Sequence, residues 1–272
     1  MSNSKVADSL FLNVLGFQPL RYFLGELLRY YRLKRGKYIV KSEYRKNGFF
    51  LINNFLEEKE FCLLKDEFEN IMQENFIIDS FSNPKNKDSK IRVFYYNFEP
   101  NDELQSKYPK LCELYNNSLI RNHFQANEQK NECEINMQIE RVVGVEGSKL
   151  DIQQSWHVDT FHQTHKGWLY LSKVELDTAP FNFVLGSQKF SFKRAIWEWY
   201  QSIFYSLKGG DPSFRVNHDD LIFFENNVKE ITSNENTLFF ANSCGIHKRG
   251  YIKPNKNRDS IHFDSRENVF HF

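Results

Sequence analysis

The sequence predicts an α+β fold in which helices occupy the first third of the chain and a β-rich barrel or sandwich follows from about residue 134. Aromatic residues make up 16% of the 272 residues, and aromatic side chains favour strands and pocket linings. Apolar residues recur every three to four positions before residue 134, and after it they alternate with polar residues in short runs. A chain of this length is sufficient for one large domain preceded by an N-terminal extension.

Residues 1–43 are predicted to form an amphipathic helical extension. Residues 10–33 are rich in apolar side chains, but polar and charged residues interrupt them too often for a membrane-spanning helix. From Pro19 onward the apolar side chains recur at helical spacing, at Leu20, Phe23, Leu24, Leu27, Leu28 and Tyr31. Basic residues surround this stripe. The helix is therefore predicted either to pack on the protein's own core or to contact a membrane surface or partner through residues 10–37.

Residues 44–272 are predicted to form a single domain. Its first part reads as a strand at residues 49–52, a turn, and a helix with one apolar face. The apolar positions of that helix are Phe61, Leu64 and Phe68. A polar loop is expected at residues 79–90, and helical spacing returns at residues 104–124.

The strand-like runs concentrate in the second half of the chain. CEINMQIERVVGVEGSKLDIQQSWHVD alternates apolar and polar residues on both sides of a turn signal at residues 144–148, which predicts a β-hairpin. Further strand-like runs are GWLYLSKVEL, FNFVLGS, NTLFFANS and SIHFDSR. The segment FKRAIWEWYQSIFYSL interrupts them and is predicted to be a helical insertion.

Charge and cysteine usage exclude some classes of protein. The 36 Lys and Arg residues balance 35 Asp and Glu residues, so the net charge does not favour a nucleic acid partner. The cysteines are widely spaced without a CxxC pair, which indicates a reducing compartment and argues against a thiolate zinc site. The opening MSNSKVADS lacks the basic and apolar pattern of a secretory signal. These features predict a cytoplasmic location, with peripheral attachment to the inner face of the membrane as an alternative; they do not predict an oligomeric state.

The stretch SWHVDTFHQTHKGWLY contains the strongest candidate for a metal site. Residues two apart in a strand point to the same face, so His157 and Asp159 can aim an imidazole and a carboxylate at one point. The candidate third ligand is His247, with Gly245 before it permitting a close turn. Two histidines and one carboxylate form the facial triad suited to non-haem Fe(II), with three coordination positions open. A 2-oxo acid can occupy two of these positions and O2 the third, and Arg258 can bind the far carboxylate of the 2-oxo acid in a bidentate ion pair.

Motif residues and longer stretches together resemble the phytanoyl-CoA dioxygenase family of Fe(II)- and 2-oxoglutarate-dependent oxygenases. The matching motif residues are His157, Asp159, His247 and Arg258. GFFLINNFLEEKEFCLLKDEF is similar to the family's N-terminal strand and helix. APFNFVLGSQK resembles its Gly-Pro-Phe…Val-Pro-Gly-Ser-His-Lys segment, although Leu185 and Gln188 stand where the family has proline and histidine. The resemblance covers about residues 44–266.

The resemblance implies a double-stranded β-helix, the jelly-roll or cupin-like barrel, with its core at about residues 134–266 and with helices flanking it. It implies three iron ligands, His157, Asp159 and His247. It also implies that Arg258 anchors 2-oxoglutarate and that, with O2, the enzyme hydroxylates an unactivated C–H bond. From strand parity, Gln138 is a candidate for a hydrogen bond to 2-oxoglutarate, and Trp168 for a wall of the iron pocket or for core packing.

Three more histidines lie near the motif residues. His162 and His165 follow Asp159 too closely to share its metal, and they are candidates for the rim of the substrate entrance. His262 has the same strand parity as Arg258 and can share its inward face.

The helical insertion and the N-terminal helix bear on the substrate. The insertion combines basic with aromatic residues, namely Lys189, Lys193, Arg194, Trp197, Trp199 and Tyr200. Such a helix suits either a simple cover on the barrel or recognition of an acidic substrate, small or lipid-linked. By analogy with bacterial members of the family, an envelope lipopolysaccharide sugar such as 3-deoxy-manno-octulosonic acid is a candidate. The competing functions are a metal enzyme that does not use 2-oxoglutarate and a non-catalytic binding protein on the same barrel.

Overall fold

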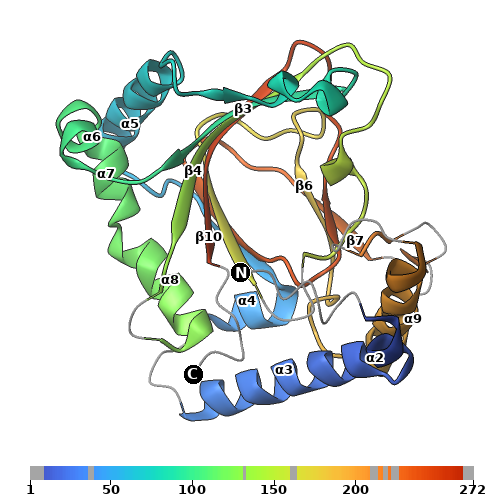
Figure 1. Cartoon of the computed structure of the whole chain (residues 1–272). Coiled ribbons are helices and arrows are strands. Elements are labelled where there is room, and N and C mark those ends of the chain that lie inside the picture. Colours follow the sequence, from blue (N-terminus) through green and yellow to red (C-terminus); the bar gives the residue numbers. More distant parts are fainter. Residues whose placement is uncertain are drawn as a thin grey trace.

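Two antiparallel β-sheets face each other across the middle of the molecule (Figure 1). The computed structural model describes residues 9–35, 40–130, 133–159, 164–208, 214–216, 220–221 and 227–265. The larger sheet has seven strands in the order β1-β8-β5-β10-β4-β3-β2, and the smaller has three in the order β7-β6-β9. The strands are β1 (Phe49–Ile52), β2 (Ile78–Asp79), β3 (Ile91–Phe98), β4 (Asn136–Gly144), β5 (His165–Tyr170), β6 (Phe181–Val184), β7 (Val228–Ile231), β8 (Thr237–Asn242), β9 (His247–Arg249) and β10 (Asn257–Ser265). This pair of sheets, with helices around it, is the predicted jelly-roll architecture of an α+β protein.

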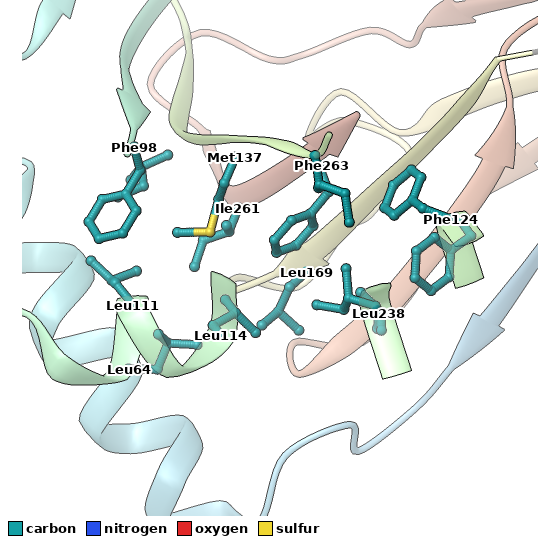
Figure 2. Close-up of a cluster of buried hydrophobic side chains, with 14 of the residues drawn as sticks. Leu64, Phe98, Leu111, Leu114, Phe124, Met137, Leu169, Leu238, Ile261 and Phe263 are labelled. Carbon is teal, nitrogen blue, oxygen red and sulfur yellow. The ribbon is translucent and has the colours of Figure 1, made fainter. Parts of the chain in front are cut away.

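The alternation of side chains along the strands gives the large sheet two different faces. One face is apolar and packs against helices α5 (Glu58–Ile71), α6 (Asp102–Lys107), α7 (Pro109–Tyr115) and α8 (Ser118–Glu128). Figure 2 shows the strand side chains Phe98, Met137, Leu169, Leu238, Ile261 and Phe263 in one cluster with the helix side chains Leu64, Leu111, Leu114 and Phe124. The predicted helix with Phe61, Leu64 and Phe68 on one face is confirmed as α5, because all three side chains are buried in this core.

The opposite face of the large sheet is aromatic and looks toward the small sheet. Trp168 and Phe239 stack with ring centroids 5.4 Å apart, and Phe181 of β6 lies 5.2 Å from Phe239. Arg258 and His262 of β10 both line the cavity on this side. The many aromatic side chains of the chain therefore line the space between the two sheets and also fill the core.

The N-terminal helices α2 (Leu10–Val14) and α3 (Phe17–Arg35) lie beside the helical insertion α9 (Phe192–Lys208) at the lower edge of Figure 1. Gln18 Nε2 of α3 donates a hydrogen bond to Glu198 Oε2 of α9 at 2.9 Å. Trp199 Nε1 of α9 donates to the backbone oxygen of Asn13 in α2 at 2.7 Å. The N-terminal helix therefore docks on the protein itself, through the insertion. In the described parts of the chain, no helix is both long enough and apolar enough to cross a membrane.

The predicted hairpin that would join β4 to the segment around His157 does not form. β4 pairs with β10 on one side and with β3 on the other, so neither edge is free for the following segment. Beyond Gly144 the chain leaves the sheet, and a 3-10 turn at Ile152–Gln154, closed by a capping box, precedes the bridge that joins His157 to His247. A turn signal marks where a chain reverses, but it does not specify which strand becomes the neighbour.

The large sheet also extends to segments that precede residue 134. Helix α4 (Ser42–Asn47) leads into β1, which pairs with β8, and β3 pairs with β4 along its full length. The sequence of β3, IRVFYYNF, does not alternate cleanly, because aromatic residues occupy both of its faces. This strand is therefore not apparent from the sequence alone.

Candidate metal centre

Three potential metal ligands, His157, Asp159 and His247, converge on one point. Each offers one ligand atom, and these atoms all lie within 4.8 Å of one another. Asp159 Oδ1 is 3.7 Å from His157 Nε2 and 3.8 Å from His247 Nε2. His157 belongs to an isolated bridge rather than to a continuous strand, and its backbone N–H and C=O both bond to those of His247 at 3.0 Å. Asp159 N donates to Ser243 O at 3.2 Å, so backbone hydrogen bonds hold the two distant segments side by side.

Hydrogen bonds to the backbone orient both imidazoles. Nδ1 of His157 lies 2.8 Å from Ser155 O, and Nδ1 of His247 lies 2.8 Å from Gly245 O. Because a carbonyl oxygen only accepts, each Nδ1 is assigned the proton and each Nε2 presents a lone pair. His157 Nε2 is buried and has no hydrogen-bond partner among the described residues. A buried acceptor that faces a carboxylate without a partner fits a metal ligand.

The protonation states of the three residues also suit a metal. Burial, with repulsion from His247, lowers the pKa of His157 to about 3. Burial likewise lowers the pKa of His247. Burial opposes ionisation of Asp159, but the Lys166 ammonium, 2.6 Å from Asp159 Oδ2, and His247 hold the pKa of this carboxyl well below its ordinary value. Two neutral imidazoles and one carboxylate are the donor set that fits Fe(II).

Gly245 allows the turn that carries His247 to lie directly on the aromatic core. A Cβ at this position would lie 2.4 Å from Cζ of Phe183, which is fully buried and cannot move aside. On the next strand, the ring of Phe181 stacks on His247 with centroids 5.2 Å apart and planes 18° apart. The close turn expected from the sequence is thus a close approach of backbone to ring.

Two arginines, Arg258 on β10 of the large sheet and Arg249 on β9 of the small sheet, share one buried carboxylate. Arg258 Nη2 lies 2.9 Å from Glu140 Oε1, and Arg249 Nη2 lies 3.4 Å from Glu140 Oε2. Burial opposes ionisation of Glu140, yet Arg249 and Arg258 lower its pKa below the ordinary value. Arg258 Nη1 also donates to Ala179 O at 2.5 Å, and Arg249 approaches Asp151 at 3.5 Å. The guanidinium of Arg258 is therefore held rigidly by groups that only accept hydrogen bonds.

A cavity of about 200 Å³ joins the histidine ligands to the arginine pair. Its lining includes Gln138, Glu140, Lys166, Trp168, Tyr170, Phe181, Arg249 and His262 in addition to His157, His247 and Arg258. Three predicted neighbours of the site, Gln138, Trp168 and His262, are thus at the cavity. The Gln138 amide donates to Asn97 Oδ1 at 2.8 Å, and Trp168 packs against His262 with ring centroids 5.0 Å apart.

One histidine does not lie where the sequence suggested. His165 is 1% exposed, and its Nδ1 lies 2.7 Å from the hydroxyl of Tyr44, so the expectation that it lines the substrate entrance is wrong. His165 is the first residue of β5. Side chains alternate between the two faces of this strand, and that of His165 lies on the face that packs against the helices. His162 lies outside the described residues.

Two cations at the cavity, Lys166 and Arg249, were not apparent as site residues. Arg249 lies two residues after His247, so strand parity is the signal that points to it. Lys166 lies on β5 two residues before Trp168, and the same parity places both at the cavity. Glu140 shared a predicted face with Gln138, but its pairing with two arginines depends on contacts between strands.

Known structures share this fold. No family model and no curated protein sequence matches the chain. The epimerase SnoN in complex with Fe3+, alpha ketoglutarate and nogalamycin RO matches with a TM-score of 0.55 and 12% identity, over 86% of this chain and 83% of that one. EctD from S. alaskensis with bound Fe matches with a TM-score of 0.56 and 10% identity, over 85% and 80%. The alpha ketoglutarate dependent carbocyclase SnoK from nogalamycin biosynthesis matches with a TM-score of 0.52 and 13% identity, over 83% and 84%.

The chain has the jelly-roll fold of non-haem iron and 2-oxoglutarate-dependent enzymes. Identities of 10–13% establish this likeness of fold only. The donor set, the buried arginine and the cavity are features of this chain itself, and they agree with the cofactors named for those structures.

Proposed function

We propose that the protein is an Fe(II)- and 2-oxoglutarate-dependent dioxygenase that hydroxylates an unactivated C–H bond, related to the phytanoyl-CoA dioxygenase family. The observation that carries the proposal is that two ligand histidines and the buried Arg258 line one cavity, with Asp159 beside the histidines. When bound there, Fe(II) with 2-oxoglutarate and O2 supplies the oxidising chemistry.

The residues around the cavity have separate tasks. His157, Asp159 and His247 would hold the metal through Nε2, a carboxylate oxygen and Nε2. Arg258, 4% exposed, would pair with the distal carboxylate of 2-oxoglutarate through the nitrogens that now contact Glu140 and Ala179. Trp168 and the neighbouring rings line the cavity and would exclude water from the space between metal and arginine.

The charges at the cavity support an acidic substrate. Arg249 and Arg258 share the carboxylate of Glu140, Arg249 also lies 3.5 Å from Asp151, and Lys166 pairs with the carboxylate that would bind the metal. Once Asp159 is a metal ligand, Lys166 loses this partner and can bind an anion. A sugar acid, small or lipid-linked, fits this description, and 3-deoxy-manno-octulosonic acid of the cell envelope is one such compound.

Anaerobic addition of Fe(II) and 2-oxoglutarate tests the reaction class. The expected result is a weak visible charge-transfer band, lost in His157→Ala and weakened in Arg258→Ala. If folded wild-type protein binds Fe(II) but gives no band, a metal enzyme that does not use 2-oxoglutarate is favoured. If it binds neither, a non-catalytic binding protein is favoured. Undiminished succinate release by Asp159→Ala and His247→Ala would refute the ligand assignment.

The substrate class requires a separate experiment. Membrane glycolipids from cells with and without the gene are compared by mass spectrometry, and a gain of one oxygen atom that depends on the gene is expected. The purified enzyme with Fe(II) and 2-oxoglutarate should produce the same gain on the isolated lipid. If neither experiment detects a gain of oxygen on an acidic glycolipid, that substrate is excluded and the reaction class is left standing.

A further inference from the structure

Helix α3 faces the protein with its polar side and faces outward with its apolar side. Gln18 and Tyr22 are 5% and 0% exposed, and both contact residues of the insertion segment. The apolar stripe expected to face a core is instead exposed, with Leu20 at 50% and Leu27 at 51%. A monomeric soluble protein rarely exposes such a continuous stripe without a function for it.

Helix α9 repeats this arrangement. Its inward side chains Arg194, Trp197 and Glu198 are buried. Its outward side chains recur at helical spacing and are exposed, namely Phe192, Ile196, Trp199, Tyr200, Phe204 and Leu207. Phe11 in α2 and Leu15 directly after it are 71% and 67% exposed.

The outward sides of the three helices form one surface, here called the outer face. Phe190 links two of them, because its ring lies 5.9 Å from that of Phe23 in α3 and 5.7 Å from that of Phe192 in α9. The Trp199 indole joins α9 to α2 through its hydrogen bond to Asn13 O. Figure 1 shows α2 crossing next to α9, with α3 continuing along the same edge of the molecule.

The charged side chains that the structure describes on the outer face are all basic. Among the described side chains of α2, α3 and α9, every exposed one is apolar, aromatic or a lysine. The exposed lysines are Lys34, Lys193 and Lys208. Neither of the two acidic residues of these helices is exposed: Glu198 is buried against Arg194 at 2.7 Å, and Glu26 is mostly buried, 3.9 Å from Arg29. Because the surface is apolar and carries three exposed lysines, it is complementary to a partner that is both apolar and negatively charged.

We propose that the outer face docks the protein on the surface of an anionic lipid bilayer. Apolar and aromatic side chains would enter the boundary between headgroups and acyl chains, and the lysines would pair with lipid phosphates. Exposed Trp199 and Tyr200 are residue types that favour this boundary. A second copy of the chain is a poorer match, because a twofold contact through this face would place lysines against lysines without an acidic residue to pair with them. The proposal stands independently of the metal chemistry.

Sedimentation of the full chain with lipid vesicles tests the proposal. We expect binding to vesicles that contain phosphatidylglycerol, little binding to phosphatidylcholine alone, and release at high salt. Lys193→Ala combined with Lys208→Ala should weaken binding about twenty-five-fold, since each lysine near an anionic surface contributes about fivefold. Phe204→Ser combined with Leu207→Ser should abolish binding. The matched control pair on α5, Lys59→Ala with Leu63→Ser, changes the same residue types at exposed positions and should bind as the wild type does.

The outcomes separate this proposal from the proposed function. The Phe204 and Leu207 variants should keep the visible band with Fe(II) and 2-oxoglutarate, which shows that they are folded. If wild-type protein binds both kinds of vesicle equally, or neither, the proposal fails whatever the band shows. It also fails if light scattering detects a lipid-free dimer that the Phe204→Ser and Leu207→Ser changes dissociate. If vesicle binding holds while the band is absent, only the proposed function fails.

Discussion

Lys166 competes with any metal for the Asp159 carboxylate, because its Nζ lies 2.6 Å from Asp159 Oδ2. A positive charge at this distance opposes the binding of a divalent cation. We therefore expect Lys166→Met to raise the affinity for Co(II), a redox-stable probe of the iron site, by about tenfold or more. The metal-free variant should also unfold at a lower temperature, since Asp159 would lose its partner. Calorimetric titration and thermal melting measure the two effects.

A matched lysine distinguishes this competition from a general loss of charge. Lys173 pairs with Glu175 at 2.9 Å at an exposed position. Lys173→Met should leave both the metal affinity and the melting temperature close to those of the wild type. An unchanged Co(II) affinity in Lys166→Met would contradict the competition.

Gly245 is the residue at which the smallest change should damage the site. Gly245→Ala places a methyl group 2.4 Å from Cζ of the buried Phe183, so the turn that carries His247 must shift. We expect a loss of about 1–3 kcal/mol in the free energy of unfolding together with weaker Co(II) binding. Gly186→Ala is the control: Gly186 has a positive φ of 80°, and its added Cβ would meet no atom within 4 Å, so strain should reduce its stability but not its metal affinity. Wild-type metal affinity in Gly245→Ala would show that the turn can shift without cost to the ligand.

The sequence is sufficient to predict that His157, Asp159 and His247 converge, but not that Lys166 and Arg249 lie at the same cavity. His157 and Asp159 could be matched because residues two apart in extended chain share a face, and Arg258 because only a permanent cation suits a distal carboxylate. In the sequence alone, nothing distinguishes Lys166 and Arg249 from other basic residues of strands, because their position at the cavity depends on which strands lie beside theirs. The pairing of β5 with β10 brings Lys166 to the cavity and the pairing of β9 with β6 brings Arg249 there, and no local pattern contains either register.

At the scale of elements, the periodicity of helix α3 predicts which residues form an apolar stripe, but it does not predict whether that stripe faces the protein or the solvent. The spacing of Leu20, Leu24 and Leu27 predicts one apolar face, and the structure leaves that face exposed. The inward side is decided by the hydrogen bonds of Gln18 and Tyr22 with the insertion segment, which lies 160 or more residues later in the chain. The same holds for β4: its sequence predicts a strand, but it does not predict that β10 and β3 are the neighbouring strands.

The buried pair of Arg194 and Glu198 should hold α9, and through it α3, in place. Arg194 Nε bonds to Glu198 Oε1 at 2.7 Å, and its Nη2 bonds to Cys244 O at 3.0 Å. Glu198→Ala would leave a buried guanidinium without its carboxylate, and we expect a loss of about 3–5 kcal/mol in denaturant unfolding. Hydrogen exchange of the α3 amides should become faster at the same time, because Gln18 also loses its partner.

A double variant tests whether the loss comes from an uncompensated charge. Arg194→Met with Glu198→Leu removes both charges and should recover much of the stability that Glu198→Ala loses. Glu113→Ala breaks an exposed ion pair with Lys110 and should have little effect. If Glu198→Ala is as stable as the wild type, the pair does not anchor the helices.

At the scale of the whole molecule, buried histidines should make stability fall in mild acid. Burial, aided by Lys41, lowers the pKa of His123 from 6.5 to about 3. Between these two pH values the unfolded chain binds a proton that the folded protein does not, so each pH unit below about 6.5 costs about 1.4 kcal/mol for this residue. Above that pH the contribution is fully present. Urea unfolding of metal-free protein from pH 8 to pH 4.5 measures the slope.

His123→Phe should flatten this pH dependence by the share of one histidine. The ring of His123 stacks on Phe240 with centroids 3.9 Å apart, and phenylalanine can preserve the stacking. A variant with the same slope as the wild type would show that His123 is protonated in the folded protein. The remaining slope is expected to come from the buried ligand histidines, and saturating Co(II) should increase it, because protons displace the metal.

The place of β10 in the large sheet has a consequence for the time at which the site can form. β10 lies between β5 and β4 in the large sheet and carries Arg258. A nascent chain emerging from the ribosome can complete its early helices, but the cavity has no arginine wall until residues 257–265 have been synthesised. Iron binding in the complete site is therefore expected only after β10 has been synthesised, and a chain arrested before that strand would present His157 and His247 without the wall that Arg258 gives the cavity.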